Sequence, residues 1–502
     1  MLFDLINKDI DTLTCPALVV FSKASSQKEK PAKITHAELN KKLSNSISEK
    51  TITGKLSEVV GYRELNYKGF RNILVIGLGK ENEIDHETIR TAIATAHDAI
   101  KSMGVKEAAI HFDGIGASKK DSASFAKAAA EGLSLVGYTM DELKSKPTAK
   151  KEKEDELNIH VVAKASDKEF KAAFTEGVIL GSCVNFSRRL GDMPGNLMTP
   201  TILANSAVEA AKGTGIKVTV WDKARIAKEK MGGLLGVSMG SSEEPRFIIM
   251  EYNGAAKTKK PVAFVGKGLT FDCGGISIKP SAGMEEMKYD MCGGANVIGT
   301  ILAIAKLKLK VNVIGIVPST ENLTGPAATK PGDIHTARNG KTFEINNTDA
   351  EGRLILADAL VYASEQDPQL IVDAATLTGA MVVALGNIHT GYYTRNAQLK
   401  AKVEKAAVAS GELVWNMPLV DHHVKDMKGT WADLSNMSSS KGAGSATAAG
   451  FLEQFVQEDI PWAHFDIAGT GWSVGNRLNY CSKRGASGVM IRTFVEIAKL
   501  AT

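Results

Sequence analysis

The sequence predicts an α/β protein: a smaller N-terminal α/β domain joined by a long helix to a larger C-terminal α/β domain with a central mixed, mainly parallel sheet. Three observations predict this class. The 502 residues are enough for two or three domains. Strand patterns alternate with helical patterns, most regularly from about residue 195. A long helical pattern ends at the breaker GDMPGN. We therefore expect an N-terminal domain at 1–166, a linker helix at 167–190 and a C-terminal domain at 191–502.

The N-terminal domain should contain short buried strands and an amphipathic helix. CPALVVFS (15–22) and NILVIGLG (72–79) are apolar and β-branched, and polar or glycine residues close them, as is typical of buried strands. HETIRTAIATAHDAIKSM (86–103) has the apolar spacing of a helix, and NIHVVAKA (158–165) indicates another strand. The polar run at 141–157 carries nearly balanced charges, so we expect a solvated loop there rather than a nucleic-acid-binding tail.

The C-terminal domain carries the regular strand–helix alternation. Its expected strands are KVTVWD, RFIIMEYN, PVAFVGKG, VNVIGIVPS and LIVDAATL. Its expected helices include MEEMKYDMCGGANVIGTILAIAKL and GRLILADALVYASEQ. Alternation of this kind favours a largely parallel sheet with helices on both faces. Ligands in such folds bind at the carboxyl ends of the strands, so the polar residues there are the candidates for a functional site.

Composition and charge exclude several classes of protein. A content of 44% hydrophobic and 23% charged residues is ordinary for a globular protein with a large core. A net charge of +5 does not by itself imply a nucleic-acid partner. The five cysteines are scattered and form no CxxC pair, which favours reduced thiols over a disulfide framework or a thiolate zinc site. The acidic N-terminus MLFDLINKDIDTL is unlike a secretory signal, and no stretch reaches the length of a membrane span. We therefore expect a cytoplasmic protein with no membrane partner.

Charged residues gather at the expected strand ends, beside glycine-rich turns that let the backbone approach a ligand closely. They are Lys267 and Asp272 after PVAFVG, Lys279 in ISIKP, Asp290 in MKYDMCGG, and Asp349, Glu351 and Arg353 in NNTDAEGRL. Clustered carboxylates repel one another, and a bound divalent cation removes that conflict. Four carboxylates could hold two ions, and pairs of ions serve in aminopeptidases, phosphatases and nucleases. From the pattern alone, a two-metal site and a set of unrelated caps and salt bridges both remain open.

Arg353 lies where a helix should begin, and a guanidinium beside a helix N-terminus makes a strong anion site.

The histidines and Cys273 offer no competing site. The sequence has no HExxH motif, and we expect His422 and His423 to be loop residues rather than metal ligands. Cys273 has no evident partner histidine, so we expect it to be a small core residue rather than a nucleophile.

Three segments together resemble the leucyl aminopeptidase (cytosol aminopeptidase) family of dinuclear-metal exopeptidases. They are VGKGLTFDCGGISIKP, MKYDMCGG and NTDAEGRLILADAL. The resemblance extends over the chain from about residue 190, including DAATLTGA and WAHFDIAGTGW, and is looser over the first third. It implies that 191–502 is a catalytic metallopeptidase domain. It also implies two divalent metal ions per subunit, Mn²⁺ or Zn²⁺, a bicarbonate, and a homohexamer with active sites facing an interior cavity.

The resemblance also implies a role for each charged residue. Asp272 and Glu351 resemble carboxylates that bridge both metals, and Asp349 resembles a ligand of one of them. Lys267 and Asp290 resemble ligands of the other metal. A lysine ligand must be neutral, so adjacent cations would have to pull its pKa well below its usual value of about 10.4.

The remaining implied roles concern the substrate. Lys279 resembles the cation that polarises the substrate carbonyl, and Arg353 resembles the residue that holds a bicarbonate acting as general base. Met287 matches a wall of the pocket for the first side chain. Further substrate-contacting positions match Asn347, Thr376, Leu377 and Gly379.

The expected function is therefore an aminopeptidase that uses metal-activated water to release N-terminal residues from peptides, with leucine and other mainly apolar residues preferred. One alternative is a two-metal phosphohydrolase. The resemblance implies that Lys267 binds a metal and that Asp290 also binds the free α-amine of the peptide, and neither role would have a purpose in a phosphohydrolase. A second alternative is a DNA-binding accessory role as an additional activity. The net charge of only +5 and the mixed-charge runs disfavour nucleic acid without excluding it.

Overall fold

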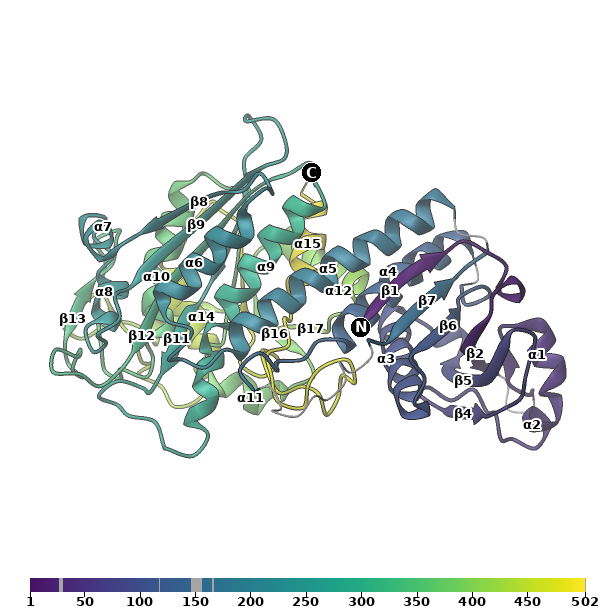
Figure 1. Cartoon of the computed structure of the whole chain (residues 1–502). Helices are drawn as coiled ribbons and strands as arrows, with labels where there is room; N and C mark the ends of the chain where they lie inside the picture. Colours follow the sequence, from purple (N-terminus) through teal and green to yellow (C-terminus); the bar gives the residue numbers. More distant parts are fainter. Residues whose placement is uncertain (27–29, 117, 146–155, 165–166, 502) are drawn as a thin grey trace. The chain divides into compact units, whose positions relative to one another are not determined.

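The computed structural model describes residues 1–26, 30–116, 118–145, 156–164 and 167–501. The chain divides into two compact units, Met1–Ser182 with Leu478–Cys481, and Cys183–Arg477 with Ser482–Thr502. We call them unit 1 and unit 2. The division falls within helix α5 (Lys168–Asp192), which therefore contributes residues to both units. Each unit is built on its own sheet (Figure 1).

Unit 1 is a mixed seven-stranded sheet in the order β1-β7-β6-β2-β5-β4, with β3 beside β2. Pairing is parallel except at β4/β5 and β2/β3. The strands are β1 (Leu2–Ile6), β2 (Cys15–Ala24), β3 (Lys33–Ile34), β4 (Val59–Tyr62), β5 (Phe70–Lys80), β6 (Glu107–His111) and β7 (Asn158–Val162). The helices are η1 (Ile10–Thr12), α1 (Ala37–Lys42), α2 (Ser44–Ser48), η2 (Glu81–Glu83), α3 (His86–Met103), α4 (Lys119–Val136) and the first part of α5. Two separate apolar clusters form its core.

Helix α3 has the bounds expected from the sequence, because a capping residue marks each of its ends. The Asp85 side chain accepts a hydrogen bond from the amide of Thr88, and Gly104 adopts a left-handed conformation (φ 76°) just after the last turn. Strands β2 and β5 also form where expected. Strand β7 ends earlier than expected, at Val162. Most of the polar run at 141–157 lies outside the described residues.

Unit 2 contains a nine-stranded sheet in the order β17-β16-β19-β15-β10-β12-β9-β8, with β11 beside β12. Its central pairs are parallel, and β8/β9, β9/β12 and β16/β19 are antiparallel, so the expected mixed, mainly parallel sheet is confirmed. The strands are β8 (Lys217–Trp221), β9 (Arg246–Asn253), β10 (Val262–Gly266), β11 (Gly268–Asp272), β12 (Asn312–Asn322), β15 (Leu370–Ala375), β16 (Thr390–Tyr393), β17 (Val414–Asn416) and β19 (Trp462–Asp466). A small sheet contains β13 (Ile334–Thr336), β14 (Thr342–Glu344) and β18 (Leu434–Ser435).

Helices cover both faces of this larger sheet. They are α6 (Pro200–Ala211), α7 (Lys223–Lys228), α8 (Gly232–Ser238), η3 (Met284–Met291), α9 (Cys292–Lys306), α10 (Gly352–Glu365), α11 (Gly379–Leu385), α12 (Ala397–Ser410), α13 (Asp421–Lys425), α14 (Gly444–Glu453) and α15 (Ile491–Lys499). Alternate residues of β10 face different helices. Ala263 and Val265 belong to the cluster around α10, whereas Phe264 packs on Phe494 of α15.

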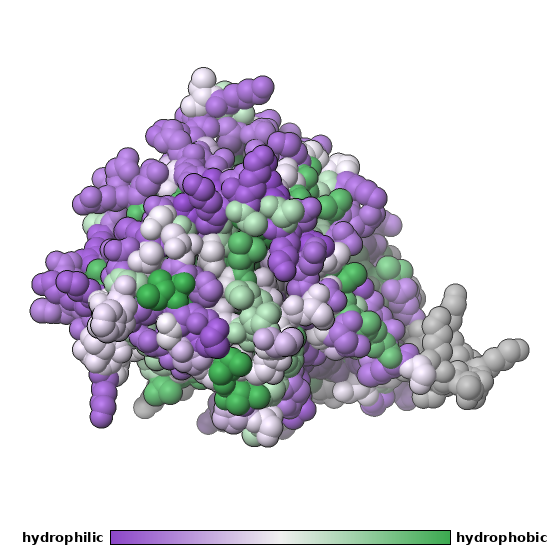
Figure 2. All heavy atoms as spheres, turned by 90° about the vertical axis from the view of Figure 1, so that its left-hand side faces the viewer, coloured by the Kyte–Doolittle hydropathy of each residue, from purple (hydrophilic) through white to green (hydrophobic). Residues whose placement is uncertain are grey.

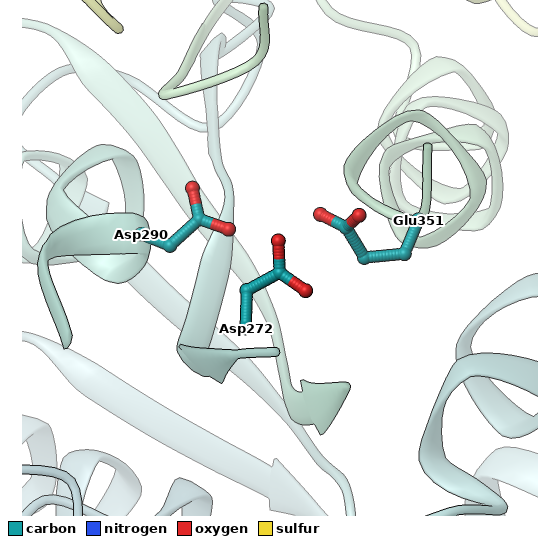
Figure 3. A group of neighbouring side chains, drawn as sticks. All are labelled: Asp272, Asp290 and Glu351. Atoms are coloured by element: carbon teal, nitrogen blue, oxygen red, sulfur yellow. The ribbon is translucent and has the colours of Figure 1, made fainter. Parts of the chain in front are cut away.

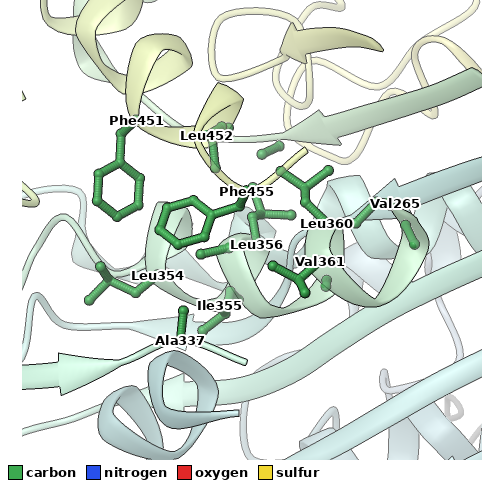
Figure 4. Packing of buried hydrophobic residues seen from close by; sticks show 14 of the residues in the cluster. Val265, Ala337, Leu354, Ile355, Leu356, Leu360, Val361, Phe451, Leu452 and Phe455 are labelled. Atoms are coloured by element: carbon green, nitrogen blue, oxygen red, sulfur yellow. The ribbon is translucent and has the colours of Figure 1, made fainter. Parts of the chain in front are cut away.

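Helix α10 is buried on nearly every side and forms the centre of the unit 2 core (Figure 4). Its leucines and isoleucines pack beside Phe451, Leu452 and Phe455. The ring of Phe343 lies edge-on to Phe451, with 5.9 Å between the ring centroids. A helix embedded in this way holds its first residues rigidly, and those residues belong to the NNTDAEGRL motif.

Two expectations about secondary structure in unit 2 were wrong. The single helix expected over 284–307 is divided into the 3₁₀ helix η3 and the α-helix α9, which begins at Cys292. The start of α9 lies against strand β15, where a Cβ at Gly293 would come 2.1 Å from the Ala374 carbonyl oxygen. His422 and His423 lie on the short helix α13, which begins at Asp421, rather than in a loop.

The structure also describes the cysteines and the lengths of the helices. No disulfide joins any of the five cysteines, all of which are among the described residues, and Cys273 is buried. Among the described residues, no helix has both the length and the apolarity needed to cross a membrane. Figure 2 shows one face of the molecule, on which hydrophilic side chains predominate and apolar side chains form small separate spots.

Candidate metal centre

Three buried acids from separate elements meet at the strand ends of unit 2. Asp272 is the last residue of β11, Asp290 lies in η3, and Glu351 directly precedes α10. One carboxylate oxygen of each lies within 4.8 Å of the others, and the three carboxylates point into a common space (Figure 3). Among the described residues, this is the only group of acids, histidines and cysteines with the spacing of a metal site.

Neighbouring polar groups fix the orientation of two of these acids, Asp272 and Asp290. Asp272 Oδ1 accepts hydrogen bonds from the Gly274 amide (2.9 Å) and from Asn322 Nδ2 (2.8 Å). Asp290 Oδ1 accepts one from the Thr376 hydroxyl (2.6 Å). Both of these aspartates therefore keep their second oxygen for other partners.

Two lysines lie between the acids. Lys267, directly after β10, places Nζ 2.7 Å from Asp290 Oδ2 and 2.8 Å from Glu351 Oε1, and it donates to the Thr376 carbonyl oxygen at 3.0 Å.

The second lysine, Lys279, approaches the acids from the other direction. It places Nζ 2.9 Å from Asp272 Oδ2 and 2.5 Å from Asp349 Oδ1. Its side chain is 22% exposed, against 3% for Lys267. Lys279 therefore lies at the mouth of the cluster, and Lys267 at its base.

The charges of this cluster do not balance. Two ammonium groups face the four carboxylates of Asp272, Asp290, Asp349 and Glu351. Burial is the largest cause of a raised pKa at Asp272, and repulsion from Glu351 and Asp290 adds to it. Together they raise this pKa to about 8. Burial also raises the pKa of Asp290 and of Asp349, although the neighbouring lysines act to lower both values. An excess of buried negative charge of this kind is relieved by a cation.

The donor atoms suit divalent metal ions. Glu351 Oε2 is buried without a hydrogen-bond partner among the described residues. Burial alone would lower the pKa of Lys267, but the carboxylates around it outweigh burial and raise that pKa. Lys267 could therefore become a neutral nitrogen ligand only if a stronger positive charge displaced its proton.

Arg353, on the first turn of α10, lies next to the metal cluster in sequence and is also buried. Its Nη1 donates to the Asn436 carbonyl oxygen (2.7 Å), while its buried Nε has no partner among the described residues. Burial lowers the pKa of the guanidinium to about 10, although Glu351 and Asp466 oppose this shift. A cationic donor with an unused N–H group fits a small anion.

Comparison with known proteins identifies the family. Residues 185–495 match the catalytic domain of the cytosol aminopeptidase family, and residues 17–147 match its N-terminal domain. The chain is 75% identical over 504 residues to a probable cytosol aminopeptidase of Bdellovibrio bacteriovorus, with full coverage of both. It belongs to the cytosol aminopeptidase family. Membership makes the chain an aminopeptidase, a hydrolase that acts on the N-terminal ends of peptides, and it confirms the resemblance seen in the sequence.

Other cytosol aminopeptidases and solved structures are also similar. A probable cytosol aminopeptidase of Burkholderia mallei is 41% identical over 446 residues, covering 89% of this chain and 87% of that protein. A mutant of tomato leucine aminopeptidase has a similar structure, with a TM-score of 0.86, 32% identity, and coverage of 100% of this chain and 96% of that one. The bottromycin maturation enzyme BotP in complex with Mn has a TM-score of 0.83 at 30% identity, over 97% of this chain and 100% of that one.

The five residues expected to contact a substrate differ in how directly they are connected to the metal cluster. Thr376 is tied directly to it through Asp290. Leu377 lies in the turn between β15 and α11, and Gly379 is the first residue of α11, where an added Cβ would meet no atom within 4 Å. Asn347 accepts a hydrogen bond from the Asp349 amide (2.8 Å). Met287 lies three residues before Asp290 in η3 and is half-buried.

Sequence reasoning missed a set of uncharged and acidic residues that hold the cluster in place. They are Asn322, Thr348 and Asn436, which bond to Asp272 or to the loops around it, and Asp466, which accepts from the Leu377 amide and the Thr378 hydroxyl in the turn after β15. Asn322 and Asp466 end β12 and β19, so polar residues closing apolar strands were the signal that could have found them. Asn436 lies in the segment SNMSSS, where neither spacing nor charge distinguishes it.

Proposed function

We propose that the protein is a metal-dependent leucyl aminopeptidase that releases leucine and other mainly apolar residues from the N-termini of peptides. The observation that carries this proposal is the buried triad of Asp272, Asp290 and Glu351 with Lys267 held between two of its members. A lysine at the base of an acid cluster has a purpose as a metal ligand, whereas a phosphohydrolase site would not require it.

The acids and Lys267 would hold two divalent ions, Mn²⁺ or Zn²⁺. Asp272 and Glu351 are proposed as bridging ligands, Asp349 as a ligand of one ion, and Lys267 with Asp290 as ligands of the other. When bound, such a pair of ions lowers the pKa of a water molecule toward neutrality and polarises the peptide carbonyl. A similar enzyme, BotP, has been solved in complex with Mn.

Lys279 and Arg353 are the proposed catalytic pair. Lys279 is partly exposed at the mouth of the cluster, so its ammonium group can approach the carbonyl oxygen of a bound peptide and stabilise the charge that develops there. The unused Nε of Arg353 would hold a bicarbonate, which supplies the general base. Arg353 is placed beside Glu351 by two residues of chain, so the proton acceptor lies close to the metal ligands.

The substrate would bind by its free amine and its first side chain. Asp290 offers a carboxylate to the α-amine, which would restrict cleavage to the N-terminal peptide bond. Met287, together with Thr376 and Leu377 of the turn after β15 and with Gly379 at the start of α11, would form an apolar pocket. Such pockets discriminate only modestly among apolar side chains, so we propose a graded preference for leucine. We also propose that the protein is cytoplasmic and assembles as a homohexamer.

Hydrolysis of leucyl amide by purified protein tests the function. The wild type should release leucine with Mn²⁺ present and not after chelation. Lys279→Ala should retain bound metal and lose most turnover, because the carbonyl then lacks its cation. Lys330→Ala, which removes an exposed lysine paired with Asp333, should remain fully active.

Phosphate esters provide the opposing measurement. Cleavage of a phosphate ester together with no release of leucine would replace the aminopeptidase by a phosphohydrolase. Duplex DNA binding at two salt concentrations tests the accessory role, which requires an affinity that falls as salt rises.

A further inference from the structure

We propose that Asn436 is a positioning residue that fixes the loop carrying Asp349 and Glu351 relative to the Arg353 guanidinium. The inference rests on the proposed function, since it assigns Asn436 the task of setting the distance between the metal ligands and the base site. Asn436 is fully buried, with 0% exposure, and follows directly on strand β18.

The side chain of Asn436 holds the loop through four hydrogen bonds. Its Oδ1 accepts from the amides of Asn346 (2.8 Å) and Asn347 (3.3 Å). Its Nδ2 donates to the carbonyl oxygens of Asn347 (2.7 Å) and Ala350 (3.4 Å). These contacts use both donors and both acceptor positions of a carboxamide, so a side chain lacking either function would leave buried peptide groups of the loop unpaired.

The backbone of Asn436 holds the guanidinium. Its amide donates to the Glu344 carbonyl oxygen (2.9 Å), which extends the parallel pairing of β14 with β18 by one residue. Its own carbonyl oxygen accepts from Arg353 Nη1 (2.7 Å). This bond occupies one end of the guanidinium and leaves Nε unpartnered among the described residues. One residue thus contacts the metal-binding loop through its side chain and the anion-binding group through its main chain.

Other contacts hold the far side of the same loop. The Thr348 hydroxyl donates to the Gly274 carbonyl oxygen (2.6 Å), and Asn322 Nδ2 donates to the Thr348 carbonyl oxygen (3.0 Å). Loss of the Asn436 side chain should therefore leave the loop attached and the metal ligands present. What changes is the fit between Glu351 and Arg353, and a misplacement of about 1 Å can reduce turnover on the order of 100-fold.

The test compares Asn436→Ala with Asn346→Ala in the full-length protein. Asn346 also bridges the two segments, since its Nδ2 donates to Ser435 Oγ (2.9 Å), but it has no hydrogen bond to Arg353 or to residues 347–350 among the described residues. Four quantities are measured: kcat and KM for leucyl amide, bound Mn²⁺ per chain, the dissociation constant of bicarbonate by calorimetry, and the melting temperature.

For Asn436→Ala we expect kcat to fall roughly 10- to 100-fold with little change in KM, and bicarbonate to bind several-fold more weakly. Bound Mn²⁺ per chain should remain as in the wild type, and Asn346→Ala should behave like the wild type. If Asn436→Ala does not fold, Asn436→Asp keeps the volume and the acceptor but loses the donors, and it should show the same two changes.

Two results would overturn the inference. Wild-type turnover and bicarbonate affinity in folded Asn436→Ala or Asn436→Asp would show that Asn436 positions nothing. Reduced turnover in proportion to lost metal, with unchanged bicarbonate affinity, would make its role purely structural. A wild-type protein that fails to cleave leucyl amide would instead overturn the proposed function, and this inference with it.

Discussion

At the scale of single residues, the metal centre depends on a lysine that is buried among acids. Lys267 has 3% of its side chain exposed, and it lies within 2.8 Å of both Asp290 and Glu351. In this arrangement the lysine acts as a counterion, since the carboxylates raise its pKa. Two divalent cations would reverse that role, because four carboxylates can balance their charge without help from an ammonium group. The same residue would thus stabilise the cluster as a cation before metal binds and as a ligand afterwards.

Replacing Asp272 with asparagine should separate folding from metal binding. Burial and repulsion raise the pKa of Asp272 from 3.8 to about 8 in the metal-free site. The unfolded chain releases this proton near 3.8, so the metal-free wild type loses stability as pH rises between these two values. The asparagine variant avoids that loss and should be at least as stable as the wild type in chelator at pH 8.

Urea unfolding with and without Mn²⁺ measures this effect. Wild type should gain about 2.7 kcal/mol at a free Mn²⁺ concentration of 100 times the dissociation constant. The variant should gain far less, because it lacks a ligand proposed to bridge both ions. A variant that is less stable than the wild type in chelator at pH 8 would contradict the stability loss that we assign to the buried Asp272 carboxylate.

Single residues also mark the limit of what the sequence could predict. Charged residues at strand ends were recognisable, because the free-energy cost of burying a charge must be offset by a partner. The structure brings Lys267, Asp272, Lys279 and Asp290 together. Asn436 was not recognisable. Its importance comes from four hydrogen bonds to a loop some ninety residues away in sequence, and no local pattern encodes such contacts.

At the scale of elements, glycine determines how closely α9 approaches the strand ends. A Cβ at Gly293 would lie 2.1 Å from the Ala374 carbonyl oxygen and 3.0 Å from the Lys267 amide nitrogen. Both neighbours are backbone, so neither can move alone. Close packing of this helix also accounts for the break before Cys292, which the apolar periodicity of the sequence did not predict. Helix α3 was predicted to the residue because its caps are local.

Gly293→Ala should therefore destabilise unit 2 and reduce activity together. Overpacking against backbone costs roughly 1–3 kcal/mol, and the shift is transmitted to Lys267. Gly299→Ala is the matched control in the same helix, where the added Cβ meets nothing nearer than 3.0 Å. Thermal unfolding and leucyl-amide turnover should show a clear loss for the first variant and a smaller one for the second. Equal effects of the two substitutions would contradict the idea that Gly293 is needed for α9 to pack closely against the backbone of Ala374 and Lys267.

In unit 1, a histidine joins three neighbouring strands. His160 on β7 lies 2.6 Å from Asp4 of β1 and 3.0 Å from Glu107 of β6. Burial alone would lower its pKa, but the two carboxylates outweigh burial and raise it. A raised histidine pKa means that the stabilisation is complete below the unfolded pKa of about 6.5 and is lost as pH rises through the folded value.

His160→Gln should therefore destabilise the protein at pH 6 and have little effect at pH 8.5. The difference should be at most about 1 kcal/mol, since both carboxylates are largely exposed and screened. His422→Gln, at an exposed position on α13, provides the control. Denaturant unfolding followed by circular dichroism at the two pH values measures the effect. A larger loss at pH 8.5 than at pH 6 would reverse the assigned sign.

At the scale of the whole molecule, the chain consists of two units with separate cores and unequal tasks. The apolar clusters of unit 1 contain no residue of the metal cluster, and every proposed ligand lies within unit 2. All five tryptophans, at 221, 415, 431, 462 and 472, also belong to unit 2. Tryptophan fluorescence therefore follows the unfolding of unit 2 alone, whereas circular dichroism follows both units.

Metal should consequently stabilise the two units unequally. A ligand raises the stability of the part of the chain whose folded form it binds, so Mn²⁺ should shift the fluorescence transition to higher denaturant. The transition seen only by circular dichroism should stay in place, and His160→Gln should move that transition and not the fluorescence one. Separate transitions are common in chains of this size with two cores. Coincident transitions that Mn²⁺ moves together would mean that the units unfold as one, and the stability of unit 1 would then depend on a metal site to which it contributes no ligand.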